Sequence, residues 1–233
     1  MMNKSMKVTL AAIGVAVLVA AVGVIWWATK DSAEPEFELS STATTARTTG
    51  TTAAPDAPAG AATWKVGAGS EAGYRIDEKL RGLSNTATAR TEDVSGQLTL
   101  DGASVSDAEF VVKLETLTSD DDMRDRRVSD DYLQTAEFPE ATFTLTGPLE
   151  LSGAPEVGTP VTVDAKGSLE LHGVTNDITV PVEAQLTAAD TLELIGSTTV
   201  ALADYEIEAP DIAGIVTSAP EGKLEFKLVL TPA

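Results

Sequence analysis

The 233-residue sequence contains no cysteine and a single histidine, His172. The lack of cysteine excludes disulfides, a thiolate nucleophile, thiolate metal ligands and an acylated lipoprotein cysteine, and one histidine excludes a multi-histidine metal site. Basic residues are also scarce, because 16 lysines and arginines face 36 aspartates and glutamates and leave a net charge of −20. Nucleic acid is therefore not an expected partner. The same charge is expected to keep the folded domain off anionic membrane surfaces.

The N-terminal region contains a run of 21 uncharged residues, 8–28. As a helix the run would be about 31 Å long, the thickness of a hydrocarbon core. Trp26 and Trp27 end it, lysines precede it and acidic residues follow it, which predicts cytoplasmic residues 1–7, a single-pass anchor and a domain outside the cytoplasmic membrane. A cleaved signal peptide is the alternative and would give a secreted protein. Because the run is long for a signal peptide, we favour the uncleaved anchor.

Residues 29–63 are rich in Thr, Ala, Pro and Gly and contain few large apolar side chains. Such a segment buries too little apolar surface to offset the entropy of ordering, which predicts a disordered linker. The composition changes at Trp64, and residues 64–233 are predicted to form one folded domain.

Within residues 64–233 apolar and polar residues alternate with period two, which is typical of antiparallel strands with one wet face. Long helical patterns do not alternate with these strands, so Rossmann-type and TIM-barrel folds are not expected. Strands with a single apolar face bury it in a sandwich or a barrel, and a barrel of about eight strands is filled or holds one ligand. The alternating segments are 72–77, 94–100, 109–115, 142–149, 161–171, 178–183, 192–194 and 223–230.

A charged stretch between residues 119 and 143 interrupts the strands. Ser119 or Asp120 is expected to cap a short helix over about 120–135, because acidic and hydroxyl side chains accept hydrogen bonds from the free N–H groups of the first turn. We predict that this helix crosses the barrel. Its apolar edge comprises Val128, Tyr132 and Leu133.

Two blocks of sequence form an ordered combination on this all-β background. The first combines Arg124-Asp125, Tyr132-Leu133, Ala136-Glu137-Phe138-Pro139 and Ala141-Thr142-Phe143, and the second is the strand and His-Gly-x-Thr turn Gly167-Ser168-Leu169-Glu170-Leu171-His172-Gly173-Val174-Thr175. In these blocks the sequence resembles the YceI-like family of lipid- or polyisoprenoid-binding proteins. The resemblance covers the region from Trp64 to Thr231, which is the whole predicted domain.

The resemblance implies an elongated antiparallel barrel, lipocalin-like in outline, that holds a long isoprenoid tail, and it allows a homodimer. The sequence departs from the family pattern in two places. Residues 77–84 lack a histidine that often follows the second strand, and residues 202–207 lack the arginine and glycine of a late family segment. These departures bear on the ligand rather than on the barrel.

The inward-phase residues of the strands are the candidate lipid-binding residues. A solid core is the alternative, because protein interiors normally pack densely. Small residues at inward positions leave more room than a filled core requires, which favours a cavity; they are Ala72, Gly96, Ala165, Gly167 and Gly196. The predicted lipid-lining residues are Tyr74, Phe110, Val112, Phe143, Leu145, Leu169, Leu171 and Phe226.

Four further residues are predicted at the head-group end or rim: Arg124, Asp125, His172 and Thr175. Arg124 and Asp125 either orient a polar head group or form an ion pair that fixes the helix to the barrel. His172 either contacts the ligand or is a structural hydrogen-bonding residue. No metal site is predicted, because the aspartates at 120–122 lack the glycine and glutamate of a calcium loop. No cofactor is predicted, and no nucleophile elbow is present.

These observations favour a membrane-tethered, extracytoplasmic protein that holds a long apolar lipid, polyisoprenoid or quinone-like, and is not an enzyme. An envelope, stress or adhesion module with a filled barrel is the first alternative. An enzyme that acts on an isoprenoid is the second.

Overall fold

The computed structural model describes residues 33–40, 61–212 and 215–233. The predicted anchor and the linker parts 29–32 and 41–60 lie outside the described residues. Across the described ranges, no helix has the length and hydropathy to cross a bilayer.

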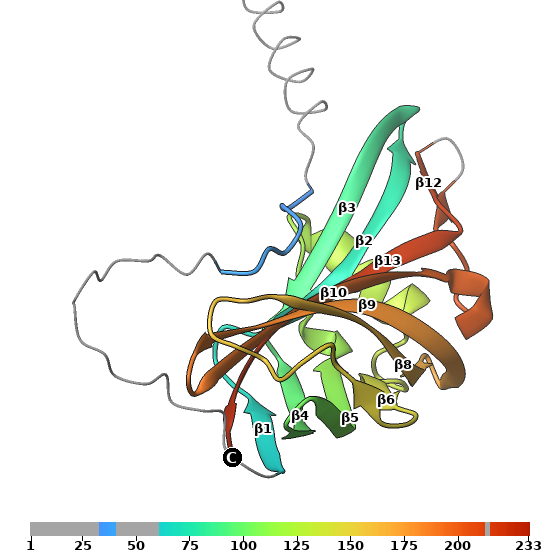
Figure 1. The fold of residues 1–233 in the computed structure, drawn as a ribbon. Coiled ribbons are helices and arrows are strands. Elements are labelled where there is room, and N and C mark those ends of the chain that lie inside the picture. Colours follow the sequence, from blue (N-terminus) through green and yellow to red (C-terminus); the bar gives the residue numbers. More distant parts are fainter. Residues whose placement is uncertain (1–32, 41–60, 213–214) are drawn as a thin grey trace, which may run out of the picture. The chain divides into compact units, whose positions relative to one another are not determined.

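Eight antiparallel strands close into a barrel (Figure 1). Their order around the ring is β1-β4-β5-β6-β8-β9-β10-β13, and β13 pairs back to β1. The prediction of an antiparallel barrel of about eight strands with one short helix is therefore confirmed. The bounds are β1 Ala62–Val66, β4 Val94–Asp101, β5 Ser104–Lys113, β6 Glu140–Leu145, β8 Val161–Leu171, β9 Val174–Ala188, β10 Thr191–Ala201 and β13 Glu221–Pro232.

The long strand β13 changes partner along its length. Its C-terminal end pairs with β1, and residues 223–227 pair instead with β2. The Ser70 hydroxyl bridges the break, since it donates to the Gly67 carbonyl at 2.8 Å and accepts from the Val229 N–H at 2.9 Å. Further strands extend the sheet past the ring. They are β2 Glu71–Leu80, β3 Leu83–Thr91, β11 Asp211–Ile212 and β12 Val216–Ser218, with β7 Leu149–Glu150 beside β5.

Strand β3 was absent from the sequence prediction. Its fully buried apolar residues are Ala87 and Ala89, 1% and 2% exposed, and alanine adds little to an alternating pattern. β3 forms because it pairs with all of β2 from Ala72 to Leu80. Pairing with β2, rather than the side-chain pattern of the segment itself, therefore makes these residues a strand.

The charged stretch forms a short helix, α2 (Asp122–Arg127), followed by a π-helical turn, η2 (Val128–Tyr132). Its cap is Asp121 rather than Ser119 or Asp120, because the Asp121 carboxylate accepts the N–H groups of Met123 and Arg124 at 2.8 and 3.2 Å. These hydrogen bonds, first that of Met123, hold the pKa of Asp121 below its usual value. The remaining helical turns are η1 Leu114–Thr116 and η3 Leu202–Tyr205.

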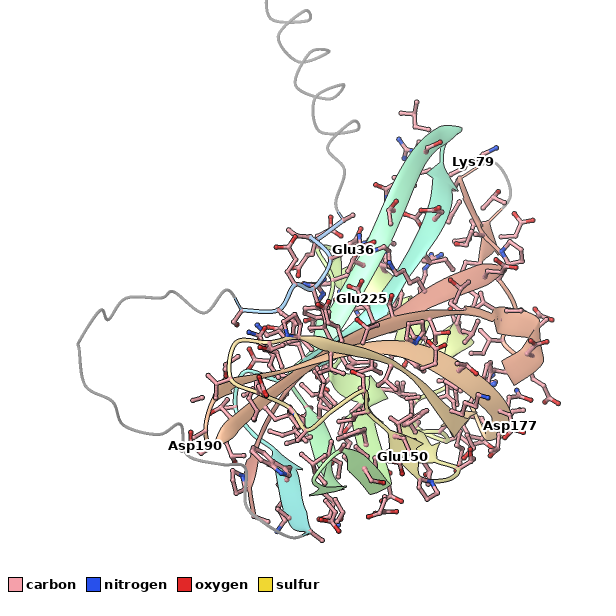
Figure 2. The ribbon with its side chains drawn as sticks, in the orientation of Figure 1. Glu36, Lys79, Glu150, Asp177, Asp190 and Glu225 are labelled. Carbon is pink, nitrogen blue, oxygen red and sulfur yellow. The ribbon has the colours of Figure 1, made fainter. Side chains whose placement is uncertain are left out.

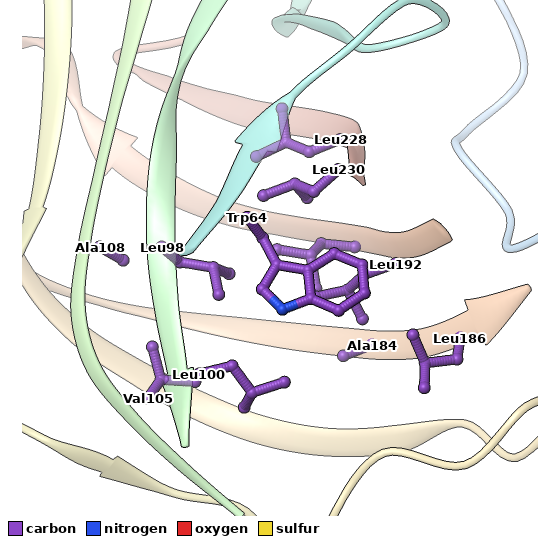
Figure 3. Packing of buried hydrophobic residues seen from close by; sticks show 11 residues of the cluster. Trp64, Leu98, Leu100, Val105, Ala108, Ala184, Leu186, Leu192, Leu228 and Leu230 are labelled. Carbon is purple, nitrogen blue, oxygen red and sulfur yellow. The ribbon is translucent and has the colours of Figure 1, made fainter. Parts of the chain in front are cut away.

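One end of the barrel is closed by packed side chains around Trp64 (Figure 3). Trp64 is 1% exposed and Leu230 is fully buried. Both lie where β1 meets the C-terminal end of β13. This cluster, with Leu98, Leu192 and Leu228 around the indole, forms the floor of the barrel.

Residues 33–40 lie, without regular secondary structure, against the outside of β2, β3, β10 and β13. The sequence analysis assigned them to the disordered linker, and the structure corrects that assignment for these eight residues. The segment has little apolar surface to bury, and ion pairs with the barrel hold it in place instead.

Candidate functional site

Above the floor the barrel encloses an apolar cavity of about 640 Å³. This volume lies in the usual range of ligand pockets, roughly 300–1,000 Å³. All eight residues that the period-two pattern predicted as lipid-lining residues line this cavity: Tyr74, Phe110, Val112, Phe143, Leu145, Leu169, Leu171 and Phe226. The pattern therefore predicted side chains that face the cavity, and their contact with a lipid stays a prediction.

Three of the inner phenylalanines lie over glycines of a neighbouring strand. Gly96 stands directly opposite Phe110, and Gly196 directly opposite Phe226. The ring of Phe143 likewise covers Gly167, where an added Cβ would lie 2.3 Å from a ring carbon. Each glycine thus lets a ring lie flat against the wall. The missing side chains do not themselves make the space, because the rings occupy it and the lumen beyond them stays open.

We expect Gly196→Ala to destabilise the barrel by about 2–3 kcal/mol, because the new Cβ would meet Phe226 at 2.5 Å and the Pro181 carbonyl at 2.9 Å. Chemical denaturation measures the change in free energy of unfolding. Adding Phe226→Leu should recover part of the loss. Gly67→Ala is the matched control, because its Cβ would make only ordinary contact, and a loss equal to that of Gly196→Ala would contradict the ring-over-glycine account.

One end of the cavity is polar: Tyr74, Glu78 and Arg124 lie together there, and the exposed residues Arg81, Asp121 and Arg127 also line the cavity. Arg124 donates to Asp120 at 2.6 Å and to Glu78 at 3.4 Å, so two carboxylates neutralise its guanidinium. The Glu78 side chain is only 8% exposed and also accepts from the Asn85 amide at 2.8 Å. Burial raises the pKa of Tyr74, although the positive charge of Arg124 opposes this. At neutral pH this end therefore presents a neutral hydroxyl and a charge-balanced guanidinium.

The family model of the YceI-like domain matches residues 64–230, which is more than half of the chain. The chain belongs to the YceI-like family. It is 31% identical to a UPF0312 protein of Shewanella sp. (strain MR-4) over 159 residues, which cover 60% of this chain and 80% of the relative. It is 28% identical to a UPF0312 protein of Vibrio parahaemolyticus over 128 residues, which cover 51% of this chain but only 63% of that relative.

A solved structure described as a polyisoprenoid binding domain from Saccharophagus degradans, implicated in plant cell wall breakdown, has a similar fold. The TM-score is 0.57 at 21% identity, and the match covers 74% of this chain and 99% of that one. At this identity the likeness shows that the YceI-like domain shares the fold.

Of the four predicted rim residues of the YceI-like domain, Arg124 alone lines the cavity. Asp125 accepts hydrogen bonds from the N–H and hydroxyl of Ser119, at 3.0 and 2.5 Å, and so fixes the turn before α2. Thr175 is exposed on β9. Neither side chain is part of the cavity wall.

His172 also lies away from the cavity of the YceI-like domain. Its Nδ1–H donates to the Tyr205 carbonyl at 3.0 Å, and its ring packs on Phe138 with centroids 4.6 Å apart. A side chain added at Gly173 would meet the same Phe138 ring at 2.6 Å. These contacts fit the structural reading of the His-Gly turn, which docks the Phe-Pro segment to the barrel.

Glu78 was missed by the sequence analysis. It occupies an inward position of β2, in phase with Tyr74, Ile76 and Leu80. A carboxylate at an apolar-phase position of a strand is the signal that would have identified it, because an inward charge requires a partner. That partner is Arg124.

Proposed function

We propose that this protein is a membrane-tethered, extracytoplasmic binding protein that holds a long apolar lipid, an isoprenoid or a quinone, inside its barrel. The observation that carries the proposal is the cavity of about 640 Å³, apolar along its wall and polar at one end. The polyisoprenoid binding named for the S. degradans domain supports it. In this proposal residues 8–28 are the tether, and the domain binds its ligand without chemistry.

Burial of the tail would supply the binding free energy. Each Å² of apolar surface removed from water contributes about 25 cal/mol, so enclosing several hundred Å² gives on the order of 10 kcal/mol before the costs of association. Tyr74 and Arg124 at the polar end would donate hydrogen bonds to the head group. The wall thus provides affinity, and the polar end sets the direction in which the lipid enters.

The charge balance at the polar end favours an uncharged head group. Arg124 is already shared by Glu78 and Asp120, so its own charge is balanced, and the other two arginines that line the cavity, Arg81 and Arg127, are exposed to solvent. A diphosphate would bring two or more negative charges beside these carboxylates, and such charges require paired cations. A carbonyl or hydroxyl head group requires only donors. The proposed ligand class is therefore a polyprenol or an isoprenoid quinone rather than a polyprenyl diphosphate.

The proposal is tested by extracting the purified full chain with organic solvent and identifying the extract by mass spectrometry. We expect a stoichiometric isoprenoid or quinone. A protein that arrives empty, and that binds neither a polyprenol nor a quinone in a fluorescence titration, would overturn the proposal.

Glu78→Gln is expected to raise affinity for a polyprenyl diphosphate about tenfold and to leave affinity for a polyprenol of the same length unchanged. Removing the Glu78 carboxylate takes one negative charge away from Arg124, which stays paired with Asp120. A charge-assisted contact to phosphate is worth at least about 1.4 kcal/mol, a factor of about ten. Competition against a fluorescent lipid measures both affinities. Glu170→Gln, an exposed carboxylate outside the cavity on β8, is the control. A wild-type protein that prefers the diphosphate would contradict the head-group assignment.

A further inference from the structure

The open end of the cavity carries exposed apolar side chains. Four large apolar residues in the described ranges are strongly exposed, and three of them lie here: Leu83 (50%), Met123 (64%) and Ile215 (47%). Met123 and Ile215 also line the cavity, as does Arg81 at the tip of the β2–β3 hairpin. The mouth is therefore bordered by apolar residues at the surface, at the end opposite the Trp64 floor.

The hairpin tip, residues 79–83, combines these apolar groups with positive charge. Its sequence is Lys-Leu-Arg-Gly-Leu, without an acidic residue. Arg81 and Gly82 form the turn with φ of 52° and 84°, and Leu80 pairs with Leu83. The Arg81 N–H donates to the Ile215 carbonyl at 2.7 Å, so Ile215 is held beside the tip. In a chain of net charge −20, this is a local surface of the opposite sign.

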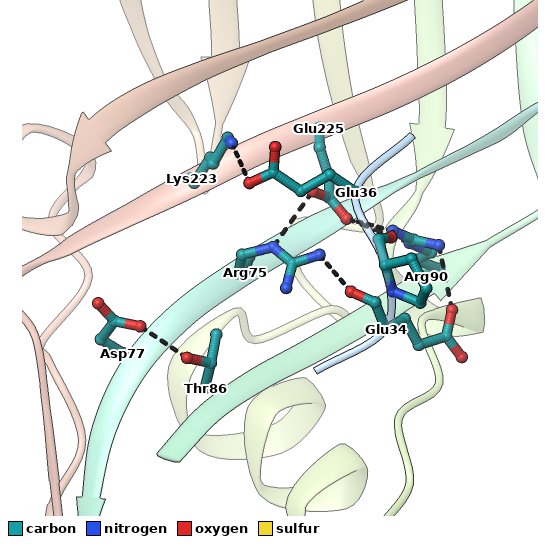
Figure 4. A network of polar contacts seen from close by, with 9 residues as sticks. Glu34, Glu36, Arg75, Asp77, Thr86, Arg90, Lys223 and Glu225 are labelled. Carbon is teal, nitrogen blue, oxygen red and sulfur yellow. Dashed lines mark hydrogen bonds and ion pairs between the residues drawn. The ribbon is translucent and has the colours of Figure 1, made fainter. Parts of the chain in front are cut away.

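A second observation concerns residues 33–40, which we term the strap (Figure 4). Its N-terminal half is held by cations: Arg75 donates to the Glu34 carbonyl at 2.6 Å, Arg90 pairs with the Glu34 carboxylate at 3.1 Å, and Lys223 pairs with Glu36 at 2.7 Å. The Arg90 guanidinium also lies 3.9 Å from the centre of the Phe37 ring. These contacts dock an acidic segment on a basic patch.

The other end of the strap is held by Glu193 and Lys227. The Ser40 N–H and hydroxyl donate to the Glu193 carboxylate at 2.6 and 2.9 Å. Burial alone would raise the pKa of Glu193, but hydrogen bonds from Lys227 and Ser40 hold it below the usual value. Glu193 therefore stays ionised, and the strap is fixed at both ends.

The strap has a definite direction on the barrel. On β13, Lys223 pairs with Arg75 of β2, and Lys227 pairs with Glu71, which lies farther from the hairpin tip. Glu36 is bound at Lys223 and Ser40 at Lys227, so the N-terminal end of the strap is the end nearer the mouth.

We propose that the apolar mouth contacts the surface of a lipid bilayer, from which the ligand enters the cavity, while the strap stays docked on the outer wall; this rests on the proposed function. The observations that carry it are the exposed Leu83, Met123 and Ile215 around the opening and a hairpin tip whose charged residues are all basic.

The contact is one of apolar insertion with flanking cations. Leu83 and Ile215 enter the interface while the stems of Lys79 and Arg81 lie along it with their charges in the head-group layer. The aspartates around Met123 keep the start of α2 from approaching anionic lipid. A lipid would then pass from the bilayer into the cavity without crossing water.

The test uses the full chain in phosphatidylcholine nanodiscs that contain doxyl-labelled lipid. Because the chain has no cysteine, Leu83→Cys and Asp190→Cys each give a single site for an environment-sensitive dye. Figure 2 shows the hairpin residue Lys79 and the control position Asp190 at opposite ends of the barrel. We expect at least threefold stronger quenching at position 83 than at position 190. Equal quenching in a chain that floats with vesicles overturns this proposal alone, and a chain that does not float overturns the tether as well.

The strap is tested separately, without a membrane readout. In the full chain, Glu36→Cys with Lys223→Cys should form a cross-link within one chain, while the control pair Glu36→Cys with Lys166→Cys, which is exposed on β8, should not. Closing the first cross-link should leave the quenching at position 83 unchanged. Absence of the cross-link, or a cross-link between two chains, overturns the proposal.

Discussion

Replacing Ala165 with tryptophan is expected to weaken lipid binding about 100-fold, equivalent to ~2.7 kcal/mol, while changing the free energy of unfolding by no more than ~1 kcal/mol. Ala165 faces the lumen from β8, opposite Val180 of β9, and lines the cavity. An indole at this position would occupy space that the ligand tail needs. In an open cavity it displaces no neighbour, so the fold tolerates it.

Titration with a fluorescent polyprenol and chemical denaturation measure the two quantities on the same protein. Lys166→Trp is the matched control, because the adjacent residue points outward and is exposed. It should change neither quantity. A filled barrel predicts the reverse result for Ala165→Trp: a loss of stability by overpacking, and no ligand affinity to lose. That outcome would favour the adhesion-module alternative.

Arg90→Leu is expected to lower the free energy of unfolding by about 3 kcal/mol, because it leaves a buried carboxylate short of a partner. Glu225 points to the outside of β13 yet its side chain is only 3% exposed, and Arg90 contacts it at 2.7 Å. Arg75 would remain at 3.4 Å as the only cation in contact with it among the described residues. The burial of this carboxylate distinguishes the pair from ordinary surface ion pairs.

The double variant Arg90→Leu/Glu225→Leu should recover much of this loss, since it removes the unpaired charge together with its partner. Glu34→Gln measures how much of the loss comes from the strap, because it removes the other carboxylate that Arg90 contacts and leaves Glu225 in place. Lys113→Leu is the surface control: Lys113 and Glu140 are 44% and 41% exposed, and water screens such pairs so that they contribute little to stability. An equal loss for Lys113→Leu and Arg90→Leu would contradict the role of burial.

The inner wall was readable from the sequence because side chains on a strand alternate strictly between two faces. That geometry placed all eight lining residues correctly, and it depended on large apolar side chains to mark the phase. It failed at β3, where alanines at 87 and 89 mark the phase weakly. The family resemblance found Arg124, but it did not separate Arg124 from Asp125 and His172, whose side chains make hydrogen bonds outside the cavity, or from Thr175, which is exposed.

The strap was not readable for a different physical reason. Composition predicted too little burial to order residues 29–63, and for an isolated segment that argument is sound. Residues 33–40 are held by a surface that residues 75, 90, 193, 223 and 227 form together. These residues are far apart in the sequence, so no local pattern predicts the surface. Long-range charge pairing of this kind is visible only after the strands have been brought together.

The partner change of β13 at Ser70 divides the barrel into a floor side, where β13 pairs with β1, and a mouth side, where β13 pairs with β2. We expect the two sides to differ in how easily they open locally. On the floor side β13 pairs with β1 and closes the eight-stranded ring, so an opening there would break the ring. On the mouth side the far edge of β3 is held by one isolated bridge among the described residues, from Arg90 to Thr118, and by a contact between the Thr91 and Thr116 hydroxyls at 2.6 Å. We expect these few contacts to open before the ring does, so that loading of the proposed lipid would not require global unfolding.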